Sequence, residues 1–135
     1  MNTKVKDLMV SPVVSTLQHK SVGHAKDIMQ KNNIQALPIV DSDKKIVGIV
    51  TPSNLLKAEE GSPISKIMTE NVYTIPEYAP IQDAARIMRK HKIHHVLVAH
   101  EKELVGIISS FDLLKLVEDK AFVAKNEAER KKKEI

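Results

Sequence analysis

The chain contains two copies of one sequence pattern, and this repeat limits the folds that it can adopt. A copy displaced by 59 positions aligns methionine, alanine, valine and isoleucine residues, among them Met9 with Met68, Val13 with Val72, Ala25 with Ala84, Met29 with Met88 and Ile34 with Ile93. After one deleted residue near position 100 the displacement becomes 58, and Val47-Gly48-Ile49 then falls on Val105-Gly106-Ile107. A repeat of this length predicts two similar structural units.

Each copy predicts the same order of elements. Short β-branched runs at residues 13–16 and 72–75 predict strands. Apolar residues with helical spacing follow Ser21 in the first copy and Pro80 in the second, which are typical residues for a helix start. Two apolar strands around a polar turn are then expected at residues 36–40 and 46–50, and again at 96–99 and 104–108. A helix follows at residues 53–58, and its counterpart begins after Ser109.

The predicted fold is of the α+β class, with two β-α-β-β-α repeats packed sheet to sheet about a pseudo-twofold axis. One copy of about 55 residues buries too little surface for us to expect it to be stable alone. We therefore expect a first repeat at residues 1–60, a second at 61–119 and a charged helical tail at 120–135. Packing the two copies against each other creates two related clefts between them.

Composition narrows the function classes. The chain has 135 residues, a net charge of +4 and no cysteine, so disulfides and thiolate metal sites are excluded. No run approaches the ~20 apolar residues of a membrane span, and a cytoplasmic protein without membrane contact is expected. Nucleic-acid binding is not expected, because the few aromatic residues are scattered and acidic residues dilute the basic tail.

The strongest motif occurs once in each copy, where a strand ends and a helix begins. It reads Gly48-Ile49-Val50-Thr51-Pro52-Ser53-Asn54 in the first copy and Gly106-Ile107-Ile108-Ser109-Ser110-Phe111-Asp112 in the second. Together with Asp7-Leu8-Met9, Lys66-Ile67-Met68 and Ala36-Leu37-Pro38-Ile39-Val40-Asp41, it makes residues 5–117 resemble a tandem pair of cystathionine-β-synthase (CBS) domains, or Bateman module.

This resemblance implies a regulatory sensor, not an enzyme. Such modules bind AMP, ADP, ATP or S-adenosylmethionine between the repeats, usually form flat homodimers, and can act on a separate regulated protein. The residues agree with the absence of catalysis, because no P-loop, HExxH or paired-carboxylate motif is present. The alternative is a ligand-independent dimerisation or protein-interaction module.

The resemblance also implies which residues bind the ligand. The acid of the motif, Asp112, would hold the ribose hydroxyls, with Ser109 and Phe111 beside it. The other residues predicted for this site are Val13, Val14, Gln35, Ala36, His94 and His95. A structural alternative exists, because Ser109-x-x-Asp112 also has the form of a helix capping box. The strand residues could equally be core, and one histidine could simply pack.

The first copy departs from the pattern, since Asn54 replaces the acid. An amide has no charge and one acceptor oxygen, so it could bond a single ribose hydroxyl. We therefore predict unequal sites, the second being weaker and built from Thr51, Ser53, Asn54, Val72 and Tyr73.

A metal site is the least supported reading of the histidines His91, His94, His95 and His100. No cysteine assists them, and Glu101 and Glu103 lie just beyond them. No metal and no catalytic cofactor are predicted.

Overall fold

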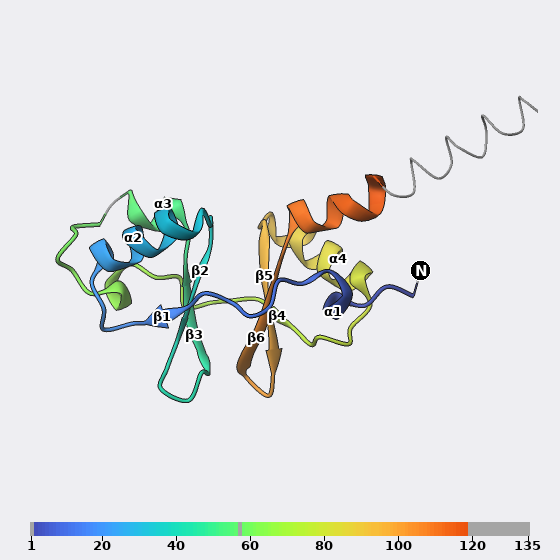
Figure 1. Ribbon diagram of the computed structural model, residues 1–135, viewed down its shortest axis with the longest axis horizontal. Helices are drawn as coiled ribbons and strands as arrows, with labels where there is room; N and C mark the ends of the chain where they lie inside the picture. The colour runs from blue at the N-terminus through green and yellow to red at the C-terminus, as the bar shows by residue number, and fades with distance from the viewer. Residues whose placement is uncertain (1, 57, 119–135) are drawn as a thin grey trace, which may run out of the picture.

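The computed structural model describes residues 2–56 and 58–118 of the chain. It contains two halves of like architecture, each with a three-stranded sheet covered by helices on its outer side, and the two sheets face each other at the centre (Figure 1). The first half holds β1 (Thr16–Leu17), α2 (Val22–Asn32), β2 (Leu37–Val40), β3 (Ile46–Val50) and α3 (Pro52–Leu55). The second holds β4 (Thr74–Ile75), α4 (Ile81–His91), β5 (His95–His100), β6 (Glu103–Ser109) and a helix at residues 110–118.

Both sheets have the same topology, with a short parallel strand on one side of an antiparallel hairpin. β1 pairs in parallel with β2, and β2 pairs antiparallel with β3. β4, β5 and β6 repeat this order. The turns of the two hairpins join the halves directly, because the backbone N–H of Ile46 donates to Lys102 at 3.0 Å and that of Leu104 donates to Lys44 at 3.0 Å. The predicted α+β fold with facing sheets is confirmed.

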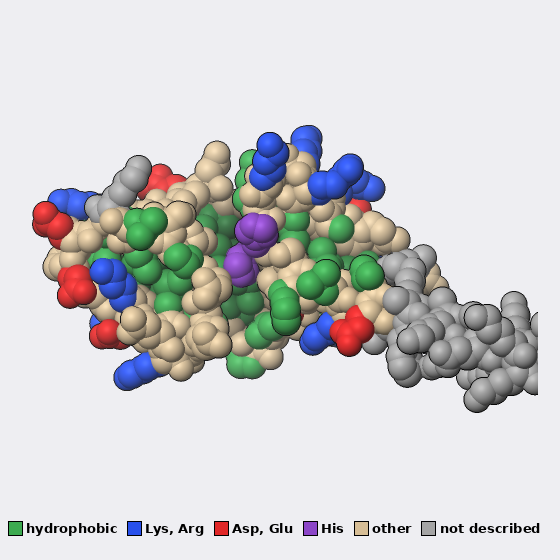
Figure 2. All heavy atoms as spheres, turned by 90° about the horizontal axis from the view of Figure 1, so that it is seen from above, with side chains coloured by type: hydrophobic (Ala, Val, Ile, Leu, Met, Phe, Trp, Pro, Cys, Tyr) green, Lys and Arg blue, Asp and Glu red, His purple; other side chains and the backbone are tan. Residues whose placement is uncertain are grey.

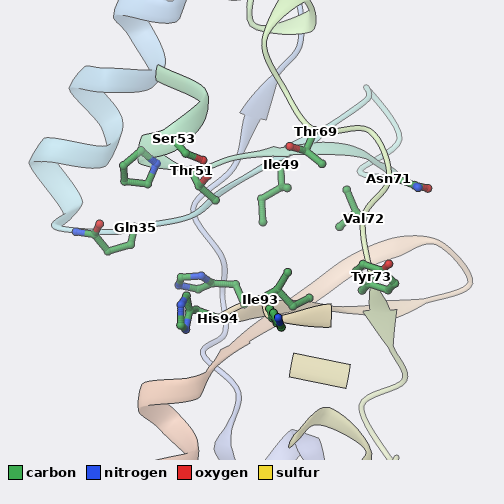
Figure 3. Close-up of a pocket in the computed structure, with 13 residues that line it drawn as sticks. Gln35, Ile49, Thr51, Ser53, Thr69, Asn71, Val72, Tyr73, Ile93 and His94 are labelled. Atoms are coloured by element: carbon green, nitrogen blue, oxygen red, sulfur yellow. Dashed lines mark hydrogen bonds between the residues drawn. The ribbon is translucent and has the colours of Figure 1, made fainter. Parts of the chain in front are cut away.

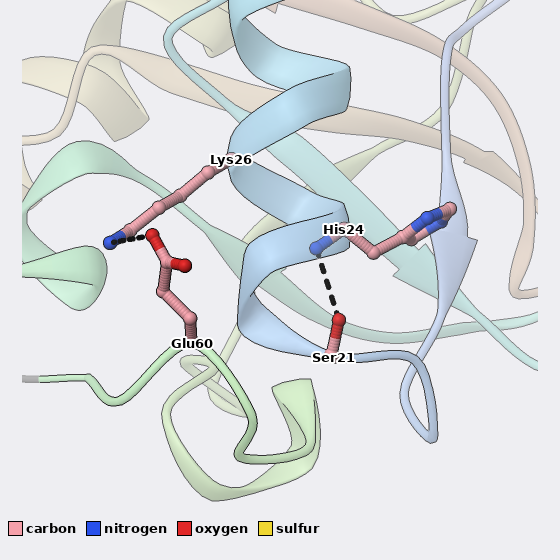
Figure 4. Close-up of polar contacts among 4 residues, drawn as sticks. All are labelled: Ser21, His24, Lys26 and Glu60. Carbon is pink, nitrogen blue, oxygen red and sulfur yellow. Dashed lines mark hydrogen bonds and ion pairs between the residues drawn. The ribbon is translucent and has the colours of Figure 1, made fainter.

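The helix starts follow from local chemistry. Ser21 caps α2, since its Oγ accepts the backbone N–H of His24 at 3.1 Å (Figure 4). Pro80 precedes α4, where its missing N–H costs nothing. Both helices end at a residue in the left-handed conformation, Asn33 with φ 50° and Lys92 with φ 54°. Asparagine tolerates this conformation better than lysine does. Asn33 therefore indicates a left-handed helix end in the first repeat, and the repeat extends this indication to Lys92.

Three predicted elements are shorter than expected. Strands were predicted at residues 13–16 and 72–75, but β1 begins at Thr16 and β4 at Thr74. The residues before β1 and β4 lie outside the strands, and β-branched composition does not distinguish the two settings. The helix predicted at 53–58 ends at Leu55. After it, the backbone N–H of Ala58 donates to the carbonyl oxygen of Leu55 at 3.3 Å, which closes one turn. The tail predicted at 120–135 lies outside the described residues.

The segments that lead into the repeats are exchanged between the halves. α1 (Val5–Leu8) begins the first repeat in sequence, yet Val5 is buried in the core of the second half with Ile75 and Met88. Conversely, η1 (Ile64–Lys66) opens the second repeat, and Ile64 lies in the core of the first half. Each repeat therefore supplies part of the other's core, which explains structurally why one copy is insufficient.

The exchanged segments also explain the glycine of the repeated motif. A Cβ on Gly48 would lie 2.8 Å from Met68 Sδ and 3.0 Å from the Thr69 carbonyl oxygen. A Cβ on Gly106 would meet the side chain of Met9. Each glycine thus lets the lead-in of the other repeat approach its strand closely.

The described helices include none that is both long and apolar enough to cross a lipid bilayer.

Candidate functional site

A pocket of about 600 Å³ lies between the two halves and is the main candidate site (Figure 3). Its first wall comes from the end of β3 and the start of α3, with Ile49, Thr51 and Ser53. The second wall comes from the start of β5, with His94 and His95. Its size lies within the 300–1,000 Å³ of small-molecule sites.

The segment between η1 and β4 forms a third wall. It contributes Thr69, Asn71, Val72 and Tyr73. The backbone fixes this segment on both sides, since Thr69 N–H donates to Ile49 O at 2.9 Å and Leu97 N–H donates to Tyr73 O at 3.2 Å. The pocket is thus bounded by both halves and by the chain that links them.

The structure distributes the predicted residues differently from our expectation. Gln35, His94 and His95 were predicted for the Asp112 site, but they line the pocket together with residues predicted for the second site, namely Thr51, Ser53, Val72 and Tyr73. The other residues predicted for the first site do not line this pocket: Val13, Val14, Ala36, Ser109, Phe111 and Asp112. Ala36 is buried, whereas the Phe111 side chain is 75% exposed.

Asn54 lies beside the pocket with its side-chain amide fully engaged. Its Oδ1 accepts the Thr51 backbone N–H at 2.8 Å and the Thr51 hydroxyl at 3.0 Å. Its Nδ2 donates to Ile67 O at 2.8 Å and to Thr69 Oγ1 at 3.2 Å. These bonds tie the start of α3 to the third wall, so Asn54 has a structural role that its sequence position did not suggest.

Asp112 forms the capping box that was the structural alternative to ligand binding. Its Oδ2 accepts the Ser109 backbone N–H at 2.8 Å and the Ser109 hydroxyl at 2.9 Å. In return, Asp112 N–H donates to Ser109 Oγ at 3.1 Å. Within residues 2–56 and 58–118, the hydrogen bonds of this carboxylate all involve Oδ2, which leaves Oδ1 as an acceptor on a partly exposed side chain. Ribose binding by Asp112 stays a prediction.

The two adjacent histidines differ in environment. Burial lowers the pKa of His95, the nearby His94 lowers it further, and Asp112 partly opposes both effects. His95 is therefore neutral at pH 7. His94 is exposed, and its Nδ1 lies 3.4 Å from the Ser110 hydroxyl. His94, as the exposed one of the two, is better placed to contact a phosphate group.

Tyr73 presents one face to the pocket and covers the other with His91. The two rings are stacked, with centroids 4.0 Å apart and an interplanar angle of 21°. This stacking fixes the orientation of the tyrosine ring, which suits it to pack against a flat group in the pocket. Among the described residues, no three His, Asp or Glu side chains are grouped so that they could hold a metal ion.

Six pocket residues were not predicted: Ile49, Pro52, Thr69, Asn71, Lys92 and Ile93. Lys92 directly precedes Ile93 and His94, and its repeat partner is Asn33. A comparison of the two copies position by position would have singled out Lys92, because a basic residue there replaces an amide while both helix ends keep the left-handed conformation.

Comparison with known proteins agrees with this architecture. The family model of the CBS domain matches the chain twice, over residues 5–61 and 64–119. The crystal structure of the CBS domain pair of protein MJ0100, in complex with 5′-methylthioadenosine and S-adenosyl-L-methionine, superposes with a TM-score of 0.83. It is 36% identical, and the match covers 89% of this chain and 99% of that one.

Two enzymes are similar over a part of their length. L-aspartate semialdehyde sulfurtransferase of Methanocaldococcus jannaschii is 38% identical over 117 residues, which are 84% of this chain and 23% of the enzyme. Inosine-5′-monophosphate dehydrogenase of Aquifex aeolicus is 36% identical over 113 residues, which are 80% of this chain and 23% of that enzyme. The chain thus spans about a quarter of each enzyme.

Proposed function

Because the chain belongs to the CBS domain family and contains two CBS domains in tandem, we propose that it is a non-catalytic regulatory module that binds an adenosine-containing ligand between its halves. The observation that carries this proposal is the central pocket, which both halves and their linking segment enclose. A ligand in such a place contacts both halves at once. It therefore favours the relative orientation in which those contacts are best, to the extent of its differential affinity.

The chemistry of the pocket suits a nucleoside. Val72 and Ile93 offer apolar contact, and the fixed ring of Tyr73 can pack against a base. The hydroxyl groups of Thr51, Ser53 and Thr69 can bond sugar or phosphate oxygens. The solved relative that binds S-adenosyl-L-methionine and 5′-methylthioadenosine supports the choice of an adenosine ligand over other flat molecules. AMP, ADP and ATP belong to the same candidate class.

The Asp112 side chain does not line the central pocket. The pocket adjoins Asn54, whose amide is occupied, whereas Asp112, at the equivalent position of the second repeat, keeps Oδ1 as an acceptor. We propose two unequal sites: Asp112 holds the ribose of one adenosine ligand, and the central pocket beside Asn54 holds a second ligand more weakly or with another specificity.

Calorimetric titration with AMP, ADP, ATP and S-adenosylmethionine tests this assignment. Asp112→Ala should weaken binding by about 1.5–3 kcal/mol, the scale of a charged hydrogen bond. The variant Thr51→Ala/Ser53→Ala should leave binding at Asp112 unchanged and weaken binding in the central pocket. Loss of binding in the double variant alone would leave the central pocket as the ligand site and remove Asp112 from it.

A cytoplasmic homodimer that transmits the ligand's effect to a separate protein completes the proposal. The helix at residues 110–118 carries Phe111, Leu114 and Val117, which are 75%, 56% and 65% exposed. They recur every three residues and so lie near one another on the helix surface, away from the sheets. A partner copy would bury this apolar strip.

A further inference from the structure

Met9 and Met68 occupy equivalent positions in the two repeats, just after α1 and η1. Each side chain lies against the motif glycine of the other repeat. The sulfur of Met68 takes the space that a side chain at Gly48 would need, 2.8 Å from the position of a Cβ there, and the sulfur of Met9 does the same at Gly106. Met68 also packs against the apolar core of the first half, and Met9 against that of the second. The two thioethers therefore help to hold the lead-in segments onto β3 and β6.

The four methionines within residues 2–56 and 58–118 form two symmetric pairs that differ in exposure. Met29 and Met88 lie in the cores of the two halves and are 6% and 5% exposed. Met9 and Met68 are only partly buried. Figure 2 shows the junction between the halves from one side, where histidines and hydrophobic side chains reach the surface. The chain has no cysteine, so no thiol competes with these methionines for an oxidant.

Oxidation of a methionine turns an apolar thioether into a polar sulfoxide, with an added oxygen on the sulfur. The niche at Gly48 leaves little room for this oxygen, because the Thr69 carbonyl oxygen lies only 3.0 Å from the same Cβ position. The two oxygens would also face each other with like partial charge. A sulfoxide at Met68 must therefore turn out of the niche, and its apolar contact with the core is lost.

Met68 lies between the bonds that hold the third wall of the central pocket. The Asn54 amide donates to Ile67 O at 2.8 Å and to Thr69 Oγ1 at 3.2 Å, one residue on each side of Met68. Thr69 and Ile49 exchange backbone hydrogen bonds of 2.9 Å in both directions. From Thr69 the wall continues along the pocket (Figure 3) with Asn71, Val72 and Tyr73. Displacement of Met68 therefore loosens this wall at its start.

The equivalent contact of Met9 lies outside the pocket and provides an internal control. Val10 and Ile107 exchange backbone hydrogen bonds of 2.8 and 3.1 Å, but neither residue lines the central pocket. Within the described residues, Asp112 bonds to Ser109 and not to the segment of Met9. Oxidation of Met9 should thus loosen the second half and leave the third wall of the pocket in place.

We propose that Met9 and Met68 are sites of reversible oxidation by a peroxide, and that oxidation of Met68 loosens the third wall of the central pocket. The thioether sulfur attacks one oxygen of hydrogen peroxide, an S–O bond forms as the O–O bond breaks, and the second oxygen leaves as water. The sulfur loses two electrons, which the peroxide takes up. A methionine sulfoxide reductase returns the thioether. The consequence for ligand affinity rests on the proposed function, whereas the oxidation and the loosening do not.

Peptide mass spectrometry of the folded whole chain after treatment with hydrogen peroxide tests the two sites. Met9 and Met68 should gain one oxygen at least about tenfold faster than Met29 and Met88, which react only when the cores open. Equal rates for the two pairs would overturn the proposal.

Amide hydrogen exchange of the oxidised chain tests the loosening without any ligand. The amides of Ile49 and Thr69 should exchange about tenfold faster after oxidation and recover after treatment with a sulfoxide reductase. Met68→Leu keeps a similar apolar volume but cannot form a sulfoxide, so peroxide should not change exchange in this variant. Met9→Leu is the matched control and should keep the response. Unaltered exchange of both amides in a chain oxidised at Met68 would refute the loosening.

Titration with ADP tests the consequence for the ligand. In Asp112→Ala the central pocket remains as the site, and oxidation should weaken ADP binding about tenfold there. Asp112→Ala/Met68→Leu should lose this sensitivity. Equal affinity before and after oxidation would refute the link to the ligand. No ADP binding in either state would count against the proposed function, while the exchange rates of Ile49 and Thr69 would still decide the oxidation site.

Discussion

The side-chain amide of Asn54 donates a hydrogen bond to the carbonyl oxygen of Ile67 at 2.8 Å, fastening α3 to the segment that begins the other repeat. A carboxylate in this position has no proton to donate and would face the carbonyl with like partial charge. The pseudo-equivalent Asp112 bonds only to Ser109 in the described part of the chain. The amide of Asn54 therefore links the two repeats, whereas the carboxylate of Asp112 keeps an oxygen that can accept a further hydrogen bond.

Asn54→Asp should therefore destabilise the protein by about 1–3 kcal/mol, because Ile67 O and Thr69 Oγ1 lose their donor. Asp112→Asn, the reciprocal change, keeps an oxygen for the Ser109 bonds and should cost less than about 1 kcal/mol. Urea unfolding of the two variants measures the difference. Equal losses would mean that Asn54 is only a helix cap.

The two motif glycines should differ in their tolerance of alanine. A Cβ at position 48 meets the Thr69 backbone oxygen at 3.0 Å, which cannot move without shifting a wall of the pocket. At position 106 the three atoms nearest to a Cβ all belong to the flexible side chain of Met9. Gly48→Ala should cost about 1–3 kcal/mol and Gly106→Ala less. Thermal unfolding checks the order, and Met9→Ala should relieve the second variant while leaving the first unchanged.

His95 should make the protein less stable in mild acid. Its pKa is lower in the folded chain than in the unfolded one, where it is about 6.5. The unfolded state therefore binds more protons, and the free energy of unfolding falls as the pH drops through about 6.5 toward the folded pKa. His95→Gln should lose part of this dependence between pH 7 and 5, measured by urea unfolding.

His100→Gln is the matched control, since His100 is exposed at the end of β5. The same pH dependence in His95→Gln as in the parent chain would contradict this account. Asp112→Asn should lower the pKa of His95 further, because it removes the carboxylate that raises it. Titration followed by NMR measures that change.

The apolar strip of Phe111, Leu114 and Val117 should mediate self-association. Leu114→Glu places a charge at its centre and should shift the protein from dimer to monomer in sedimentation experiments. Leu56→Glu is a matched control, because Leu56 is the repeat equivalent of Leu114 and is 85% exposed. A monomeric parent chain, or a dimer that survives Leu114→Glu, would refute this interface.

The sequence was sufficient to predict the fold, because the repeat, the β-branched strands and the helix caps agree with one another. It did not predict that Val5 and Ile64 exchange between the two cores, since an apolar residue does not specify which of two similar cores it enters.

The site was predicted less well for a related reason. Thr51, Ser53, Val72 and Tyr73, which were predicted for one site, all line the same pocket. His94 and His95 stand at the start of β5, and only the geometry places them in the pocket with Thr51. The tether made by Asn54 required knowledge of the exchanged segment.

Thermal unfolding of the purified chain with AMP, ADP, ATP and S-adenosylmethionine, each at millimolar concentration, tests the central claim most directly. A ligand present at 100 times its dissociation constant should add about 2.7 kcal/mol of stability, which raises the melting temperature by several degrees. A shift with at least one of these ligands, reduced in Asp112→Ala, is the predicted result. No shift with any of them would contradict adenosine sensing and favour a ligand-independent interaction module.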